Sequence, residues 1–184
     1  MYLLVNERVA MKKNYHLVNS EVVRTVGDVI ELDASNVECL KHLSEKSIRR
    51  RIRFCSHMAD DDILHEMFIV HEKNTYVRPH KHMEKIESVH IIEGLVDVVI
   101  YDDYGKIQNV INMGDYSSGK TFYYRMFAPV FHSLIIRSDK LVFHEITNGP
   151  FRREDTIFAP WSPDGANIEE SIEYLNRLRN EVTY

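Results

Sequence analysis

The chain lacks most of the features that would set it apart from an ordinary cytoplasmic domain. Its two cysteines, Cys39 and Cys55, have no paired spacing that would indicate zinc binding or a disulfide framework. No stretch approaches the ~20 consecutive apolar residues of a membrane-spanning helix. The apolar residues 2–5 meet polar and charged residues too soon for a secretory signal. These absences favour a reducing cytoplasm and argue against a membrane partner.

A strong excess of one charge is also missing. The net charge is −5 and the isoelectric point is near 6.1. Both values argue against nucleic acid as a partner, because a nucleic-acid surface is usually basic. The one basic cluster, residues 49–53, is interpreted more readily as a solvated strand or helix end than as a phosphate site.

The length and composition predict a single domain. The chain has 184 residues, of which 44% are hydrophobic and 28% charged, as in globular proteins. There are no internal repeats, low-complexity tracts or proline-rich linkers. We expect one domain over residues 1–184, with an N-terminal extension to about residue 60. A β-barrel core over residues 61–148 would follow, and then an irregular wrap and a helix over residues 149–184.

The hydrophobic pattern predicts a mainly β protein. Short apolar runs predict strands at residues 2–5, 22–26 and 29–32, and Ser35 with Glu38 looks like the capping box of a helix over residues 36–48. Eight short strands follow, separated by turn signals, at residues 63–71, 75–82, 88–92, 95–101, 106–113, 121–128, 132–137 and 141–147. Such a series, without intervening helices, is typical of an antiparallel sandwich or barrel. A cap at residues 167–170 and an apolar stripe predict a terminal helix.

The residues that carry the chemistry are gathered in one short stretch. His80 and His82 are two positions apart, so in a strand they point the same way, roughly 7 Å from one another. Glu87 lies at an odd offset from His82, and the chain must therefore bend within the polar residues 81–85. Two imidazoles and a carboxylate form a mixed nitrogen and oxygen site for a divalent metal. His132, after an aromatic-rich strand, is the fourth candidate ligand.

This ligand set indicates an open metal site. A single histidine is more often a surface or core residue than a ligand, and the prediction depends on the whole pattern. A purely structural zinc site would be closed by four ligands, usually cysteines, and no cysteine is placed to do so. Four protein ligands around a six-coordinate ion leave two positions for water or substrate. The set suits Fe(II), Zn, Mn, Ni, Co or Cu, and the sequence does not choose among them.

The pattern His-x-His, four residues, Glu, six residues, Gly, which ends at Gly94, resembles the first conserved block of the cupin superfamily. Two departures are visible: Asn74 stands at the leading glycine of that block, and residues 128–129 replace the small-residue turn before His132. The resemblance implies a cupin-type double-stranded β-helix, a jelly-roll barrel. To this barrel the chain would add an N-terminal strand and helix extension and a C-terminal helix.

A narrower resemblance covers residues 47–163. It is to the WbuC-type family of cupin-fold metalloproteins, which is found beside bacterial surface-polysaccharide genes. The segments that carry it are Arg51-Ile52-Arg53 leading to His57, Tyr76-Val77-Arg78-Pro79-His80-Lys81-His82, Lys85-Ile86-Glu87-Ser88, Tyr101-Asp102-Asp103-Tyr104-Gly105, Tyr124-Arg125, Phe131-His132, Phe143-His144-Glu145, Gly149-Pro150 and Phe158-Ala159-Pro160-Trp161-Ser162-Pro163. This resemblance implies a metal site and a setting in polysaccharide synthesis, but no particular reaction.

Three further residues are predicted to serve catalysis: Tyr76, Arg125 and Glu145. Tyr76 shares the strand face of the two neighbouring histidines. The resemblance favours Arg125 as a pocket residue over the opposite face of its strand, which carries Tyr124, although an ion pair would explain the arginine equally well. Glu145 or His144 would act as a general acid or base, and only one of them can face inward.

We therefore expect a metal-dependent enzyme acting on a small polar metabolite or sugar derivative, in the synthesis of a bacterial surface polysaccharide such as O-antigen. Isomerase, hydrolase and oxygenase chemistry are not distinguished. The alternatives are a non-catalytic metal- or sugar-binding module and an Fe(II)-dependent dioxygenase. Arg78, Arg125 and Lys85 would neutralise an anionic substrate, or else serve as exposed charges and ion pairs. The expected partner is a small-molecule substrate, with a homodimer as the candidate assembly.

Overall fold

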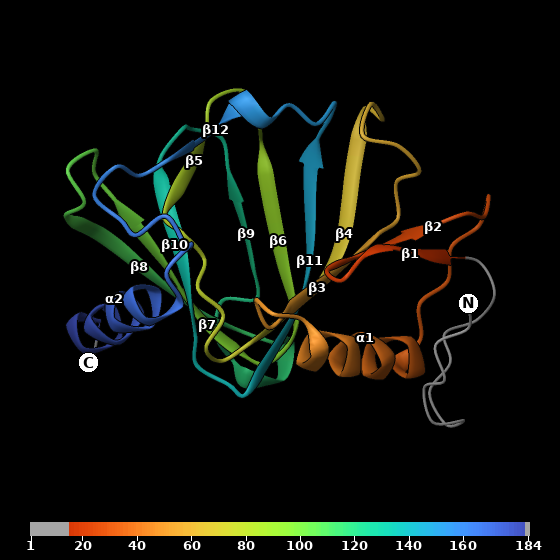
Figure 1. Cartoon of the computed structure of the whole chain (residues 1–184), viewed down its shortest axis with the longest axis horizontal. Coiled ribbons are helices and arrows are strands. Elements are labelled where there is room, and N and C mark those ends of the chain that lie inside the picture. The colour runs from red at the N-terminus through yellow and green to blue at the C-terminus, as the bar shows by residue number, and fades with distance from the viewer. Residues whose placement is uncertain (1–14, 183–184) are drawn as a thin grey trace.

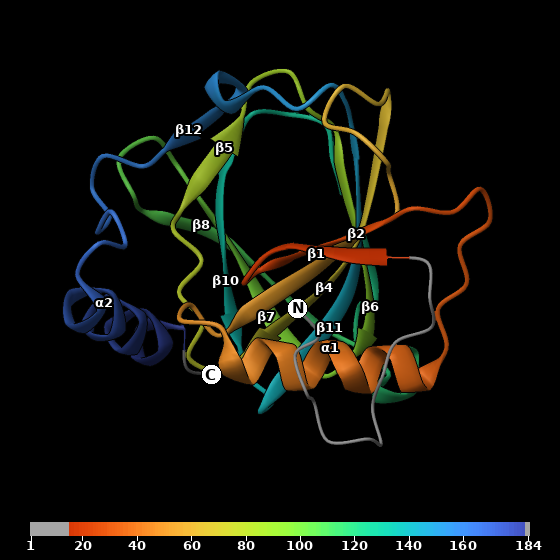
Figure 2. The same cartoon turned by 45° about the vertical axis from the view of Figure 1, so that its right-hand side comes forward.

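Two facing β-sheets form the body of the protein, and the computed structural model describes residues 15–182. The larger sheet has seven strands, in the order β1 (Tyr15–Asn19), β2 (Val22–Thr25), β3 (Arg51–Cys55), β4 (Leu64–Glu72), β11 (Lys140–Asn148), β6 (Glu87–Glu93) and β9 (Tyr123–Met126). The smaller sheet has five, in the order β12 (Thr156–Phe158), β5 (His80–His82), β10 (Phe131–Ile136), β7 (Leu95–Tyr101) and β8 (Ile107–Gly114). From β4 onward the chain passes repeatedly from one sheet to the other, so residues distant in sequence face one another (Figure 2).

Helices cover the outer faces of this sandwich (Figure 1). Helix α1 (Ala34–Lys46) lies on β3 and β4, and helix α2 (Ile168–Glu181) lies beside the smaller sheet. Two short 3-10 turns, Tyr116–Ser118 and Arg153–Asp155, complete the described elements. Within residues 15–182, no helix is long and apolar enough to cross a membrane.

The alternation of side chains along the strands sorts the core into an inner and two outer layers. On β7, Val96 and Val98 pack between the sheets with Ile91 of β6 and Phe143 of β11. The next residue, Val99, points outward and packs with residues of α2 and the C-terminal wrap. A third apolar cluster lies under α1. This period of two assigns each strand one inner and one outer face, and it decides which polar side chains can meet between the sheets.

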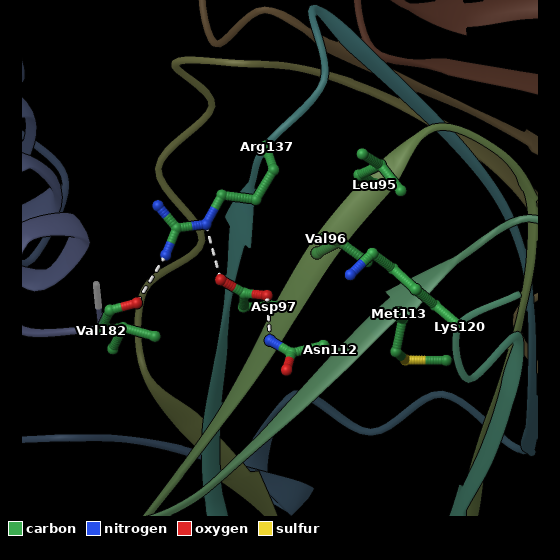
Figure 3. Close-up of a pocket in the computed structure, with 8 residues that line it drawn as sticks. All are labelled: Leu95, Val96, Asp97, Asn112, Met113, Lys120, Arg137 and Val182. Carbon is green, nitrogen blue, oxygen red and sulfur yellow. Dashed lines mark hydrogen bonds and ion pairs between the residues drawn. The ribbon is translucent and has the colours of Figure 1, made fainter. Parts of the chain in front are cut away.

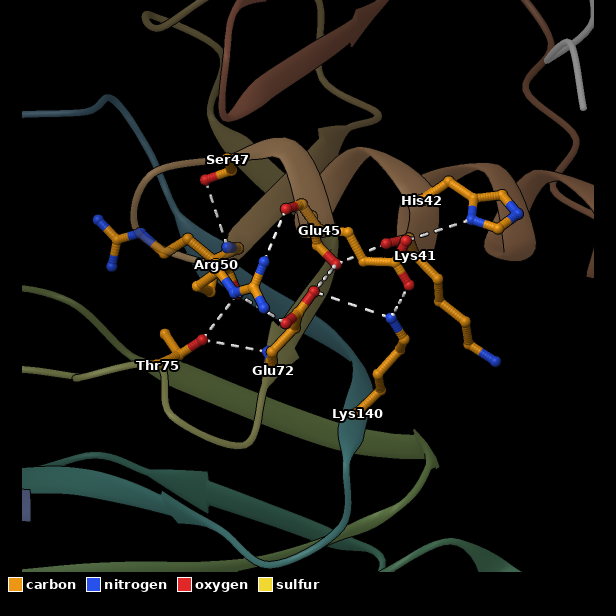
Figure 4. A network of polar contacts seen from close by, with 10 residues as sticks. Lys41, His42, Glu45, Ser47, Arg50, Glu72, Thr75 and Lys140 are labelled. Atoms are coloured by element: carbon orange, nitrogen blue, oxygen red, sulfur yellow. Dashed lines mark hydrogen bonds and ion pairs between the residues drawn. The ribbon is translucent and has the colours of Figure 1, made fainter. Parts of the chain in front are cut away.

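A polar network fastens the end of α1 to the larger sheet (Figure 4). The Arg50 guanidinium lies 3.1 Å from a Glu72 carboxylate oxygen, and the Lys140 ammonium lies between Glu72 and Glu45. The Thr75 hydroxyl donates to the Arg50 carbonyl at 2.7 Å. These contacts lie at the C-terminal end of β4. They stabilise the packing of α1 on the sheet and do not involve the opposite end of the sandwich, where β4 begins.

The predicted fold class is confirmed: the chain is mainly β, with a cupin-like pair of interleaved antiparallel sheets and a C-terminal helix. The sheets form an open sandwich and do not close into a continuous barrel. One strand pair, β2 with β3, is parallel. The division of the chain into extension, core and wrap stays a prediction.

Some local predictions need correction. The N-cap of α1 is Asp33, which accepts from the Asn36 amide while the Asn36 side chain accepts from the Asp33 amide, so the capping box is not the one predicted at Ser35. The helix consequently begins at Ala34. No strand forms at residues 29–32, and residues 75–79 are irregular. The strand predicted at residues 2–5 lies outside the described residues.

Truncating Leu40 tests whether α1 is part of the cooperative core. Leu40 has no exposed surface and packs with Ile52 and Val70 under the helix. We expect Leu40→Ala to lower the free energy of unfolding by about 2 to 5 kcal/mol, because it leaves a cavity. Ile48→Ala, at an 81% exposed position, should change it by less than about 0.5 kcal/mol. Urea denaturation measures both, and equal effects would contradict this role of α1.

Candidate metal centre

Three imidazoles converge on the inner face of the smaller sheet. His80 and His82 come from β5, and His132 comes from the neighbouring strand β10. One ring nitrogen from each of the three lies within 4.8 Å of the others. His132 is the direct cross-strand partner of His80, which places the two rings 4.5 Å apart between centroids. The short strand β5 therefore presents both of its histidines toward the third.

A carboxylate reaches this cluster from the opposite sheet. Glu87 begins β6, and its two oxygens lie 3.5 Å from Nε2 of His82 and 3.7 Å from Nε2 of His132. Between His82 and Glu87 the chain crosses from one sheet to the other, as the odd offset predicts. The Asn148 side chain fastens this turn, since it accepts from the Ile86 amide at 2.7 Å and donates to the Glu84 carbonyl at 3.1 Å.

Tyr124 positions the carboxylate. Its hydroxyl donates to Oε1 of Glu87 at 2.6 Å, from the adjacent strand β9. Glu87 is only 5% exposed, so this hydrogen bond replaces water that the acid loses on burial. The sequence resemblance favours the Arg125 face of this strand, but the pairing of β9 with β6 turns Tyr124 inward instead.

Each histidine has an oxygen beside its Nδ1. These oxygens are the Arg78 carbonyl at 2.8 Å for His80, the Thr156 hydroxyl at 3.1 Å for His82 and the Val130 carbonyl at 3.1 Å for His132. A carbonyl can only accept, so Nδ1 of His80 and His132 carries the proton and Nε2 is left with its lone pair. Partners of this kind fix the tautomer and ring orientation of histidines that bind metals.

The electrostatics of the cluster agree with this donor set. Burial, assisted by the neighbouring imidazoles His132 and His82, lowers the pKa of His80 to about 3. Burial opposes ionisation of Glu87, but the imidazoles of His132 and His82 outweigh it and hold the pKa of that carboxyl well below its usual range. Burial also opposes the charging of His132, yet Glu87 raises the pKa of His132 above its ordinary value. Thus Glu87 is ionised and His80 is neutral near pH 7.

Glu145 lies on the same inner surface. On β11 it is the cross-strand partner of Val89 and Met67, both of which belong to the inner core. His144 occupies the opposite face, where its ring stacks on Phe68 at 4.5 Å. Burial, and then the charge of Glu87, raise the pKa of Glu145 to about 8. Of the two candidates for the acid or base, the structure brings Glu145 toward the centre.

Arg125 is not brought to the centre. It is the partner of Ser88 on the outer face of β9, it is exposed, and its guanidinium lies 4.8 Å from the centroid of the Phe127 ring. Since neighbouring residues of a strand point in opposite directions, the inward position of Tyr124 requires Arg125 to point outward.

Tyr76 also lies apart from the histidines. Its hydroxyl donates to the Pro163 carbonyl at 2.9 Å, and its ring meets Tyr174 of α2 at 5.9 Å between centroids. Helix α2 covers the outer side of the smaller sheet, whereas the histidines face the inner side. These contacts give Tyr76 a part in holding the C-terminal wrap.

A cavity of about 520 Å³ lies elsewhere, at the β7–β8 hairpin (Figure 3). Its lining is Leu95, Val96, Asp97, Asn112, Met113, Lys120, Arg137 and Val182. The buried carboxylate of Asp97 accepts from Arg137 at 2.6 Å and from Asn112 at 2.7 Å. Asp97 is already satisfied by these protein groups, so the cavity is best explained as part of the scaffold.

The fold and the histidine cluster together define a class: a cupin-like β-sandwich whose three imidazoles suit a divalent metal. A family model described as a domain of unknown function (DUF6016) matches residues 32–113. None of the curated proteins matches the chain.

Many solved structures resemble the chain, and three of them are described here. They are a variant of oxalate decarboxylase from Bacillus subtilis (17% identity, 53% of this chain and 24% of that chain, TM-score 0.43), a cupin 2 conserved barrel domain protein from Rhodopseudomonas palustris (12%, 56% and 63%, 0.43) and a sugar phosphate isomerase of the cupin superfamily from Silicibacter pomeroyi (22%, 48% and 52%, 0.36). The chain thus spans about a quarter of the length of the decarboxylase. At identities this low, the similarity does not indicate an activity.

The Tyr124→Phe variant tests whether the Tyr124 hydroxyl positions the Glu87 carboxylate. We expect Tyr124→Phe to weaken the binding of a divalent metal such as Ni²⁺ about 10- to 100-fold, because the carboxylate loses the donor that positions it. Tyr123→Phe, on the outer face of the same strand, is the matched control and should bind like the wild type. Calorimetric titration of the metal-free proteins measures both affinities. Equal affinities for the two variants would show that the hydrogen bond is irrelevant to binding.

Protons should compete with the metal at His132. In the metal-free protein Glu87 raises the pKa of His132, so His132 is the imidazole of the cluster that gains a proton first as the pH falls, whereas His80 stays neutral well below pH 6. Affinity should therefore fall as the pH is lowered, by about tenfold per unit once His132 is protonated. Titrations in buffers of different ionisation enthalpy count the released proton. An affinity that is constant between about pH 5 and 8 would contradict this assignment.

Proposed function

We propose that the protein is a metal-dependent enzyme that acts on a small polar metabolite, with His80, His82, Glu87 and His132 as the metal ligands. The observation that supports it is the convergence of three imidazoles from one sheet and one carboxylate from the other, within 4 Å of two of those imidazoles. This donor set fits a divalent transition metal, and its lack of cysteine differs from that of closed structural zinc sites.

The proposed ligands and Glu145 would have different roles. The four ligands would hold the ion, which when bound supplies Lewis acidity to an oxygen atom of the substrate. Glu145 is the proton carrier in this proposal: its carboxyl faces the same inner surface, and a pKa of about 8 keeps it protonated at neutral pH. A protonated acid of this kind can donate to a leaving or developing oxyanion, and its conjugate base can accept a proton in return.

The two alternatives differ from this proposal in different ways. A non-catalytic metal- or sugar-binding module would need the ligands but no protonated acid beside them. An Fe(II)-dependent dioxygenase would need the same ligands and would consume oxygen when loaded with iron. Isomerase and hydrolase chemistry both use a proton carrier, so they are the reaction classes that the position of Glu145 favours.

Membership of the WbuC-type family belongs to the same proposal, and so does a setting in surface-polysaccharide synthesis. The support is the sequence resemblance, above all residues 158–163, whose contacts with Arg78 and Tyr76 fasten the C-terminal wrap. A cytoplasmic location and a homodimer stay predictions.

Exchange of a ligand tests the proposed activity. We expect His80→Ala to lose metal binding and to lose turnover of polar metabolites by at least about a thousandfold, since the ion contributes several kcal/mol to the transition state. His90→Ala, on the outer face of β6, should keep both. Metal analysis, circular dichroism and a screen of phosphorylated and carboxylated sugars provide the measurements. Turnover that survives chelation of the metal would refute the proposal.

A further inference from the structure

Strand β9 is a free edge of the seven-stranded sheet, because it pairs only with β6. Next to this strand, the Ile91 amide donates to the Phe122 carbonyl at 2.8 Å. Bonded and non-bonded residue pairs alternate along an antiparallel ladder, so the backbone of Tyr124 also bonds to β6. The N–H and C=O groups of Tyr123 and Arg125 therefore point away from β6, toward the open side of the sheet.

The side chains beside this open edge are aromatic and cationic. Tyr123 is 49% exposed, and Phe127, directly after β9, is 69% exposed. The exposed Arg125 guanidinium lies 4.8 Å from the centroid of the Phe127 ring, and it forms no ion pair with any residue within 15–182. Tyr116, which is 81% exposed, adds another ring at 5.5 Å from that of Phe122. Aromatic residues and arginine are the residue types that protein interfaces favour.

The other edge of the same sheet, β1, is less suited to pairing. Its register against β2 is interrupted between Leu17 and Asn19, and such irregularities are a common protection of sheet edges. The large exposed side chains of β1 are the aliphatic Leu17 and Val18. Strand β9 pairs with β6 without an interruption, so it is the regular edge of this sheet and a template for a further strand.

The edge of β9 is complementary to itself. Two copies of the strand can pair antiparallel about a two-fold axis at Tyr124, which places Tyr123 of one copy opposite the partner subunit's Arg125. Both residues have free backbone groups, so each would exchange both hydrogen bonds with its counterpart. On the outer face, the ring of Tyr123 would meet a guanidinium, and the symmetry repeats this cation–π pair. An axis at Arg125 would instead bring two like charges together.

We propose that a second copy of this chain pairs with the first along β9, so that the two seven-stranded sheets join into one continuous sheet across a homodimer. The exposed rings beside β9 would be covered in both copies at once. The interface would also adjoin Tyr124, whose hydroxyl donates to Glu87, so dimerisation would stabilise the strand that supports the candidate metal centre. The proposal does not depend on the metal or on the proposed activity.

Sedimentation equilibrium of the full chain tests this dimer, and the wild type should be dimeric at micromolar concentrations. Arg125→Pro removes an N–H group that β6 does not use, and proline is tolerated at such an edge position. We expect Arg125→Pro, Arg125→Glu and Tyr123→Ala each to weaken dimerisation at least about tenfold, because each removes a contact at the centre of the interface. Circular dichroism and urea denaturation check that the variants fold.

Matched substitutions elsewhere on the surface are the controls. Arg177→Glu changes an exposed cation on α2, and Tyr104→Ala removes a 91% exposed ring between β7 and β8. Both should dimerise like the wild type. A wild type that is monomeric at every concentration would overturn the proposal. So would a dimer whose dissociation constant is the same in Arg125→Pro, Arg125→Glu and Tyr123→Ala as in the wild type.

Disulfide cross-linking tests the register. Hydrogen-bonded residue pairs of an antiparallel ladder are about 5.5 Å apart between Cα atoms, a distance that a disulfide spans. A mixture of Tyr123→Cys and Arg125→Cys should form a covalent dimer under mild oxidation. Neither variant should do so alone, since identical positions lie diagonally and farther apart, and the native Cys39 and Cys55 are buried. A covalent dimer of one variant alone, or none in the mixture, would contradict the proposed pairing.

Discussion

The contact between Glu87 and the imidazoles of the opposite sheet is the interaction on which the rest of the site depends. It is a long-range contact, made where β6 begins and where β5 and β10 lie side by side. Two sheets packed face to face are separated by about 10 Å, so a glutamate from one and histidines from the other can meet at the middle. Apolar residues fill most of the remaining inner surface, and they hold the sheets at the separation that this contact needs.

The same contact explains how several ionisable groups persist between the sheets. An isolated charge in such a place is unfavourable, and its removal from water costs several kcal/mol. Glu87 is therefore surrounded by groups that favour its charge: the Tyr124 hydroxyl and two imidazoles. Glu145, which lacks donors of this kind, responds in the opposite way and keeps its proton. Two carboxyl groups on one surface are thus driven to different protonation states by their neighbours, which is a common way for proteins to separate an acid from an ionised ligand.

The clustering of His80, His82 and Glu87 could be predicted from the sequence because their spacing is local and has a physical meaning. The two-residue interval of His80 and His82 sets their common face, and the odd interval to Glu87 requires a turn. The choice between Tyr124 and Arg125 could not be made in this way, since it depends on which residue of β9 lies opposite Val89. Tyr76 has the parity of the histidines, but β5 begins only at His80, so parity does not extend to residue 76. The usual capping-box pattern, with glutamate or glutamine at the third helical position, does not find the cap of α1. In this helix Asn36 supplies the reciprocal hydrogen bond in place of a glutamate.

The short strand β5 pairs with β12, a strand that is synthesised after the three histidines and Glu87. Its partner β12 supplies Thr156, whose hydroxyl meets His82 across a separation of 74 residues. A growing chain whose residue 132 has just left the exit tunnel would contain all four proposed ligands but would lack the folded strand that supplies Thr156 to His82. The proposed metal geometry would accordingly be complete only after β12 has folded onto β5, and a shorter chain would leave His82 without its Thr156 partner.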